Sequence, residues 1–254
     1  MSSPTSTQGS TLSPAEIVRR VPVSQAANGV CYAAAGENAI TPQELEKMVT
    51  AVPSAVAKAL ERKAYYFVPL TVPEGEETRI AEKYDVALSD KAICHRNLTL
   101  GNSQCVFIST RLMDDKFSIA FEFFINVGHA FVDVAGVSQE FADLVSAQVE
   151  QGVKGETSLD AHELRRSAFD RDAANGTFRV IDEKAKTGYL NAAFSDAIAV
   201  YMLALYLDFD YYDLREREYP LLAPSALAER LRRIAQLFPA GLGYEFSIIF
   251  RRRP

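Results

Sequence analysis

Positive charge is scarce in this sequence relative to negative charge. The chain carries 27 lysines and arginines against 33 aspartates and glutamates, which gives a formal net charge of −6 at pH 7. Proteins that bind nucleic acids neutralise phosphates with a basic surface, and the only basic run here is 251–253. The charge balance therefore argues against nucleic acid as a partner.

Cysteine is also scarce. The three cysteines, Cys31, Cys94 and Cys105, cannot all pair within one chain. A disulfide scaffold is therefore not expected. We expect free thiols in a reducing compartment instead. The start of the sequence has neither the basic cluster nor the apolar core of a signal peptide. Both absences predict a cytoplasmic protein.

The sequence has no long apolar run that is free of polar residues. The best candidate, 117–137, contains Glu122, Asn126, His129 and Asp133. Four polar groups within one span would be costly in lipid. We therefore expect a soluble protein without a membrane span.

Cofactor motifs are missing as well. The sequence has no phosphate-binding loop and no dinucleotide fingerprint. Cys94, His95 and Cys105 could supply metal ligands, but no CxxC or HxxxH spacing supports a site there. No metal and no organic cofactor is predicted.

The pattern of short segments predicts one domain of the α+β class. Residues 1–12 are polar and carry no charged side chain, so they predict a disordered leader before a single domain over 13–254. Ser13 and Thr41 each begin a helix-capping signature. Pro53 is expected to interrupt the second of these helices.

The rest of the chain alternates between strand-like and helix-like patterns. Segments rich in aromatic and β-branched residues predict strands at 64–72, 92–98, 104–112, 117–124, 177–182 and 244–250. The spacing of Phe194, Ile198 and Tyr201 predicts a helix, and Ser225 is expected to cap another. The polar stretch 138–175 is interpreted as an insertion that projects from the sheet.

Cys31 is the strongest candidate for a catalytic residue. Gln25 precedes it by six positions, and Tyr32 and a run of alanines follow it. The alanines predict a helix that begins at Cys31, where aligned peptide dipoles would stabilise a thiolate. A turn at Asn28-Gly29 would return the Gln25 amide to the thiol, so that it can donate a hydrogen bond to the oxyanion. The alternative is a buried structural thiol.

His129 is the candidate base, and its surroundings allow two interpretations. Read as a strand, 127–136 begins near His129, whose ring can reach into a cleft and take the thiol proton. Read as a helix, the same region carries one polar stripe, made of Glu122, Asn126, His129 and Asp133. Such a stripe is a solvated helix edge or a metal-binding face. The β-branched valines of this stretch favour the strand.

Asp182 is the candidate acid. It ends the expected strand 177–182, before a turn expected at 186–188. A carboxylate there can orient a histidine and stabilise its imidazolium form. Aspartate also begins many turns for local hydrogen bonding, so a purely structural role is the alternative. Asp133 is the reserve candidate.

In these three stretches the chain resembles papain-like cysteine proteases, most closely the YopT/AvrPphB type of bacterial effector protease. Segment 25–33 is similar to the papain-type oxyanion and nucleophile segment. Segments 128–130 and 178–188 are similar to the His and Asp segments of the effector family, in the same order. The chain departs from that family in the distance between base and acid, 53 positions (182 − 129), and in having small residues at 34–36 where an aromatic residue is often found past the nucleophile.

The resemblance implies a papain-like fold, with a nucleophile helix packed on an antiparallel sheet. It also implies four roles: Cys31 as nucleophile, His129 as base, Asp182 as orienting acid and Gln25 as oxyanion donor. The implied activity is a cysteine protease that cleaves a peptide or protein substrate through an acyl-enzyme, in the cytoplasm or, after export, in a host cell. The same thioester chemistry fits a deamidase or an acyltransferase. The alternative from another class is a non-catalytic interaction protein that contacts its partner through the polar helix stripe.

Overall fold

The structure is a computed structural model that describes residues 11–38, 40–71, 78–81, 94–110, 115–171, 178–214 and 219–249. Its class is α+β, as the sequence predicts, with eight α-helices and one five-stranded mixed sheet among the described residues. The chain divides into two compact units: Met1–Thr50 with Glu61–Phe123, and Ala51–Leu60 with Phe124–Pro254. They are named here the sheet unit and the helical unit.

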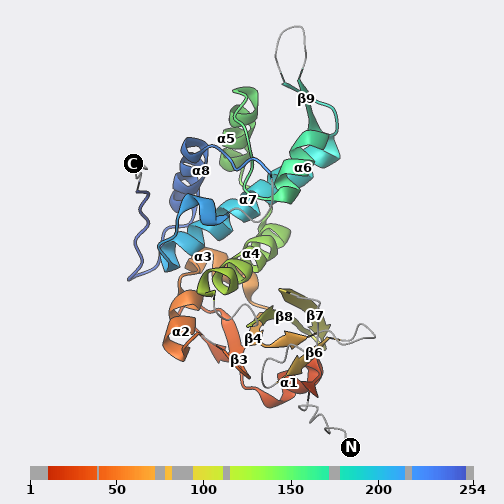
Figure 1. The fold of residues 1–254 in the computed structure, drawn as a ribbon, viewed down its shortest axis with the longest axis vertical. Helices are drawn as coiled ribbons and strands as arrows, with labels where there is room; N and C mark the ends of the chain where they lie inside the picture. Colours follow the sequence, from red (N-terminus) through yellow and green to blue (C-terminus); the bar gives the residue numbers. More distant parts are fainter. Residues whose placement is uncertain are drawn as a thin grey trace, which may run out of the picture. The chain divides into compact units, whose positions relative to one another are not determined.

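The sheet unit is built around five strands in the order β2-β3-β4-β8-β7 (Figure 1). Their bounds are β2 Ser24–Gln25, β3 Cys31–Ala34, β4 Lys63–Val68, β7 His95–Leu100 and β8 Ser103–Ser109. Strands β3, β4 and β8 are parallel, and the two outer strands are antiparallel to their neighbours. Strands β4, β7 and β8 confirm the predicted strands at 64–72, 92–98 and 104–112 within the described residues.

A second, antiparallel sheet completes the sheet unit together with a short helix. Its strands are β1 Thr11–Leu12, β6 Arg79–Ala81 and β5 Leu70–Thr71, in that order. Helix α1 (Pro14–Arg20) begins with the predicted capping box, in which Ser13 and Glu16 bond each other's backbone. The predicted leader is too long by two residues, because β1 already pairs with β6. Residues 1–10 lie outside the described residues.

The helix expected from Thr41 is interrupted at Pro53, as predicted. Helix α2 covers Pro42–Thr50, and α3 (Ser54–Ala57) follows with a 3-10 turn at Lys58–Leu60. Thr41 and Glu44 form the cap of α2 by bonding each other's backbone N–H groups. Local capping chemistry thus determines where α2 begins, whereas α3 follows Pro53 without a side-chain cap.

Helix α4 (Lys116–Ala135) replaces the strands that the sequence predicts between 117 and 136. Asp115 caps it by accepting hydrogen bonds from the N–H groups of Phe117 and Ser118, at 3.0 and 3.3 Å. Many of its buried apolar residues recur at helical spacing, among them Ile119, Ala120, Phe123, Phe124, Val127, Ala130 and Phe131. The strand prediction is wrong because tertiary burial of this face outweighs the strand preference of the valines.

The helical unit is organised around α7, which α5, α6 and α8 contact. The further elements are α5 Gln139–Glu150, α6 Leu159–Ala168, α7 Glu183–Tyr206, α8 Pro224–Leu237, the hairpin β9 Phe169–Arg171 with β10 Phe178–Val180, and a 3-10 turn Tyr211–Leu214. Strand β10 confirms the middle of the strand expected at 177–182. The turn expected at 186–188 is wrong, because these residues lie within α7. Helix α8 begins one residue before Ser225, with Ala223 at the cap position.

Two further expectations differ from the structure. Residues 139–150 and 159–168 are helical, but they belong to the core of the helical unit and do not project from it: Phe141 and Val145 of α5 are fully buried. The strand expected at 244–250 pairs with no strand in the described part of the chain. Residue 250 lies outside the described residues.

Helices α4 and α7 are each long and apolar enough, by length and composition alone, to cross a membrane. In the structure, 56% of the most apolar stretch of α4 and 78% of that of α7 are buried within the protein. Core helices meet the same criterion, so these two helices are a weak indication of a membrane span.

Candidate functional site

Cys31 is the first residue of a strand and not of a helix. Strand β3 is held between β2 and β4, and the ladder hydrogen bonds on both sides outweigh the helix propensity of its alanines. The helix prediction is therefore wrong here. Residues 31–34 do not form the helix start that the sequence predicts at Cys31.

The turn before Cys31 brings Gln25 to its side, as the sequence predicts. Gln25 is paired directly with Cys31 across β2 and β3, and Gly29 accommodates the turn with a φ of 96°. Asn28 holds the turn, because its Nδ2 donates to Val49 O at 2.9 Å. The Gln25 amide donates to Gly29 O at 3.3 Å, and Cys31 Sγ lies 4.0 Å from the same oxygen.

The registers show which face of the sheet Cys31 shares. Cys31 is paired with Ala64, and Ala64 with Cys105, so these three side chains lie on one face. Cys105 belongs to the core cluster of Tyr66 and Ile17 of α1. Burial, together with the neighbouring Cys105 and Cys31, raises the pKa of Tyr66. The thiol therefore faces the side of the sheet that α1 covers.

Helix α4 covers the opposite face of this sheet within the sheet unit. Tyr65 and Phe67 point to that face, and the ring of Phe123 packs on both, with centroids 5.0 and 5.5 Å apart. His129 belongs to the same helix and is exposed. Within the sheet unit, α4 thus covers, at Phe123, the face that Cys31 does not share.

His129 and Asp182 are not brought together in the helical unit. Asp182 caps α7 by accepting a hydrogen bond from Ala185 N at 2.9 Å. Helices α4 and α7 meet where a Cβ on Gly128 would lie 2.5 Å from Ser195 O. Asp182 precedes Ser195 by 13 residues (195 − 182), which is about 20 Å along the helix. The structural alternative for Asp182, a local hydrogen-bonding role, is the one observed.

The helical alternative for the polar stripe is confirmed, because Glu122, Asn126, His129 and Asp133 all lie on α4. Asn126 is buried, whereas His129 and Asp133 are exposed. Within the described part of the chain, no group of three His, Cys, Asp or Glu side chains is placed to hold a metal ion.

Strand β7 forms one margin of the sheet, and its backbone groups alternate in direction. Ser109 N donates to Cys94 O at 2.8 Å, so hydrogen-bonded pairs recur at every second residue of the ladder from there. His95, Asn97 and Thr99 occupy the alternate positions and direct their N–H and C=O groups away from β8. No hydrogen bond in the described part of the chain satisfies these groups. The three residues therefore form an unpaired sheet edge.

The two faces of β7 differ in chemistry. His95 lies on the α4 face, where its Nδ1 is hydrogen-bonded to the carboxylate of Glu122. Leu98 and Leu100 lie on the other face and pack against the core cluster, and Arg96 on that face is exposed. The α4 face of the edge thus carries the carboxylate of Glu122, and the other face carries the cation of Arg96 beside leucines.

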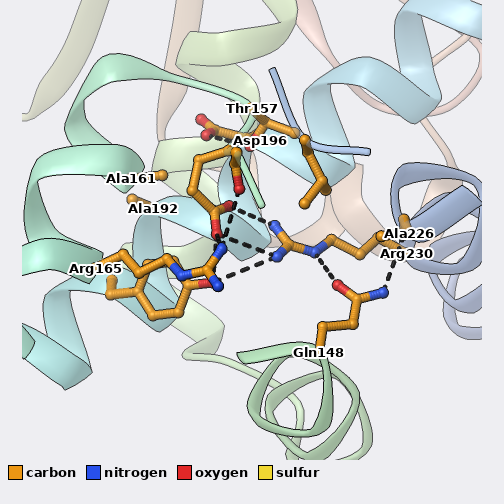
Figure 2. A network of polar contacts seen from close by, with 12 residues as sticks. Gln148, Thr157, Ala161, Arg165, Ala192, Asp196, Ala226 and Arg230 are labelled. Atoms are coloured by element: carbon orange, nitrogen blue, oxygen red, sulfur yellow. Dashed lines mark hydrogen bonds and ion pairs between the residues drawn. The ribbon is translucent and has the colours of Figure 1, made fainter. Parts of the chain in front are cut away.

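A buried polar network in the helical unit is the other concentration of charge (Figure 2). The carboxylate of Glu156 is bonded to Arg230 Nη1 at 2.8 Å, to Arg165 Nη1 at 2.9 Å and to the hydroxyl of Tyr189 at 2.6 Å. Arg230 Nε also donates to Gln148 Oε1 at 2.8 Å. These groups satisfy one another, so the network connects α5, α6, α7 and α8 and leaves no group to a ligand.

Asp196 lies beside this network and is buried. Its Oδ2 accepts a hydrogen bond from Thr157 Oγ1 at 2.8 Å. Burial raises the pKa of Asp196 to about 6, although hydrogen bonds from Ser158 and Thr157 oppose the shift. This carboxyl titrates far above its usual range because of its surroundings in the core.

Sequence reasoning missed the edge of β7, although a signal for the hairpin is present. The predicted strands 92–98 and 104–112 flank Gly101-Asn102, a pair typical of two-residue hairpin turns, and Gly101 has a φ of 62°. Such a local pattern does not predict the order of the strands in the sheet. It is that order which leaves β7 at the margin.

No protein-family model matches the chain, and no curated protein matches it. The thiol-hydrolase function and the papain-like fold therefore stay predictions.

Proposed function

We propose that this protein binds extended peptide segments, which add a strand to the free edge of β7. The observation that supports the proposal is the row of backbone groups at His95, Asn97 and Thr99 that bond to no other described residue. An added strand satisfies such groups with main-chain hydrogen bonds, and pockets for alternate side chains then set specificity. The proposal belongs to the non-catalytic interaction class.

The strand itself is suited to this role. It has six residues and contains no proline, whereas protected sheet edges are commonly short, bulged or blocked by proline. Every residue of β7 is paired with a residue of β8. The docking element is thus pre-formed, which lowers the entropic cost of binding.

The two faces predict which peptides bind. A side chain of the peptide that points to the α4 face meets Glu122 and His95, so a basic or hydrogen-bond-donating residue is favoured there. The next side chain points to the face of Arg96 and Leu98, so an acidic or apolar residue is favoured. We therefore expect ligands with a two-residue alternation.

The test changes one backbone group at the edge. Asn97→Pro removes an outward N–H and leaves the ladder to β8 intact, because proline is tolerated where the N–H faces away from the sheet. Asn97→Ala is the matched control, which loses the side chain and keeps the N–H. Decapeptides selected from a random phage library on the wild-type protein should bind Asn97→Ala unchanged and Asn97→Pro at least about tenfold more weakly.

Amide hydrogen exchange gives a second readout. In the free protein, the amides of His95, Asn97 and Thr99 should exchange faster than those of Arg96 and Leu98, and they should become protected when a selected peptide is added. Undiminished binding by Asn97→Pro, or a library that yields no binders, would contradict the proposal. Thermal unfolding of both variants verifies that the fold is retained.

The second candidate is the thiol-dependent hydrolase, with protease, deamidase and acyltransferase chemistry as its forms. The observation that favours it is the direct pairing of Gln25 with Cys31, which sets an amide donor beside the thiol. Against this candidate, Cys31 begins a strand and not the predicted helix that would activate its thiol. The predicted base His129 and the predicted acid Asp182 are also not adjacent in the helical unit.

Iodoacetamide labelling separates the two candidates. Cys94 is exposed, Cys31 is half-buried and Cys105 is buried, and burial raises the pKa of the Cys105 thiol. Exposure alone therefore predicts the labelling order Cys94, Cys31, Cys105, which peptide mass mapping can read. Labelling of Cys31 ahead of Cys94 would indicate an activated thiol and restore the hydrolase to first place.

A further inference from the structure

We propose that the segment 245–249 of one copy of this chain pairs with the free edge of β7 in a second copy. The inference rests on the proposed function, because it names an occupant of the same edge. Two independent observations support it, both made on the part of the chain that the structure describes: an unpaired strand edge in the sheet unit, and a strand-like segment without a strand partner in the helical unit.

The segment 245–249 has the side-chain pattern of a strand. Phe246 and Ile248 are half-buried, and the intervening residues Glu245, Ser247 and Ile249 are exposed. The ring of Phe246 rests on Tyr201 of α7, with centroids 5.1 Å apart. One face of the segment therefore lies on the helical unit, and the other face is open to solvent. Figure 1 shows this part of the chain as an extended blue trace after α8.

The backbone of this segment is unpaired. No hydrogen bond joins the main chain of 245–249 to the described part of the chain. Its composition of aromatic and β-branched residues predicts a strand, but a strand is stable only with a neighbour that satisfies its N–H and C=O groups. Because its own chain supplies no such neighbour among the described residues, we assign the partner to another copy.

Side-chain chemistry fits one register. In a parallel pairing, Arg96 lies beside Glu245 and Leu100 lies beside Ile249, since both pairs are four residues apart on their strands. Side chains opposite one another on neighbouring strands share a face and interact directly. The pairing neutralises an exposed cation and covers Ile249, which is 67% exposed. Phe246 can keep its contact with Tyr201, because pairing uses the edge of the segment and not its buried face.

A charge exchange tests this register between molecules. Arg96→Glu places Glu against Glu245, and Glu245→Arg places Arg against Arg96, so each variant alone should self-associate about tenfold more weakly than the wild type. An equimolar mixture of the two variants should restore association, because every contact between unlike copies then joins opposite charges. Sedimentation velocity over a concentration series measures the association of each variant and of the mixture.

The edge variants complete the test. Asn97→Pro should abolish the association, and Asn97→Ala should retain it. A wild-type protein that stays monomeric throughout the series overturns the inference, and so does association that is insensitive to both charge variants. If selected peptides bind the wild type and not Asn97→Pro while no self-association occurs, only this inference fails. If Asn97→Pro changes neither peptide binding nor association, the proposed function fails with it.

Discussion

At the scale of single residues, the helical unit depends on charges that are buried and paired. Glu156 and Arg230 are both 0% exposed and form a direct ion pair. Burial alone would lower the pKa of Arg230, but Glu156 and Tyr189 outweigh it and raise the pKa. Loss of one partner would leave an unpaired charge in the core, at a cost of about 3–5 kcal/mol. None of these residues stands out in the sequence, because the pairing joins positions far apart in the chain.

Asp196 predicts a measurable dependence of stability on pH. Its pKa is raised from 3.8 to about 6 in the folded protein, so the folded state binds this proton more tightly than the unfolded chain. The resulting stabilisation is complete below about pH 4 and is lost as the pH rises through 6, a change of about 3 kcal/mol in the free energy of unfolding. Asp196→Asn removes this titration. Urea unfolding at pH 4, 5, 6 and 7 measures the free energy of unfolding of both proteins. As the pH rises from 4 to 7, the free energy of unfolding of the variant should increase by about 3 kcal/mol relative to that of the wild type.

An exposed aspartate provides the control for that measurement. Asp133→Asn changes a solvent-exposed residue of α4 and should leave the difference from wild type nearly constant over the same pH range. A constant difference for Asp196→Asn as well would mean that this carboxyl does not titrate in the core as described.

At the scale of elements, the crossing of α4 and α7 depends on one glycine. A Cβ at Gly128 would lie 2.5 Å from the backbone oxygen of Ser195, a distance that forces one of the helices to move. Gly128→Ala should therefore lower the free energy of unfolding by about 1–3 kcal/mol, although alanine is the better helix former by about 1 kcal/mol.

The matched control is Gly241→Ala, because a Cβ there would meet nothing within 4 Å. It should change stability by less than about 0.5 kcal/mol. Urea unfolding of both variants measures the difference, and equal values would show that the helix crossing tolerates a methyl group. In the sequence this same glycine precedes His129 in a valine-rich stretch, where it is equally compatible with the start of a strand.

At the scale of the whole molecule, the described part of the region 138–175, residues 138–171, contributes to the core of the helical unit and is not an insertion. Helices α5 and α6 supply buried side chains to the helical unit, among them Phe141, Val145 and Ala161. Glu156, between the two helices, is the centre of the polar network. Because the composition of this region is polar, its few buried apolar positions do not stand out in the sequence.

Replacing 138–175 with a short Gly-Ser linker should therefore abolish the cooperative unfolding of the helical unit. The change deletes its apolar contacts and leaves Arg230 without Glu156 or Gln148. Thermal unfolding followed by far-ultraviolet circular dichroism should lose its sharp transition for the α-helical signal. A variant that keeps the wild-type transition would show that the region is dispensable, as the sequence suggests.

The sequence by itself determined those features that depend on neighbours along the chain. The capping boxes at Ser13 and Thr41, the interruption at Pro53 and the turn that sets Gln25 beside Cys31 are all present. Each is decided by hydrogen bonds or steric restrictions within a few residues. The α+β class follows as well, because it needs only the presence of both kinds of segment.

Only the tertiary structure decided between helix and strand where local preferences are weak. The alanines after Cys31 became a strand because β2 and β4 pair with it on both sides, and the region 117–136 became a helix because its apolar face is buried. Within the helical unit, Asp182 lies 13 residues along α7 from Ser195, where α4 crosses beside Gly128. In the sheet unit, strand order left His95, Asn97 and Thr99 at a margin that no other described strand pairs with. Strand order depends on which distant segments bury and bond one another, and a linear pattern of residues does not encode that choice in any single segment.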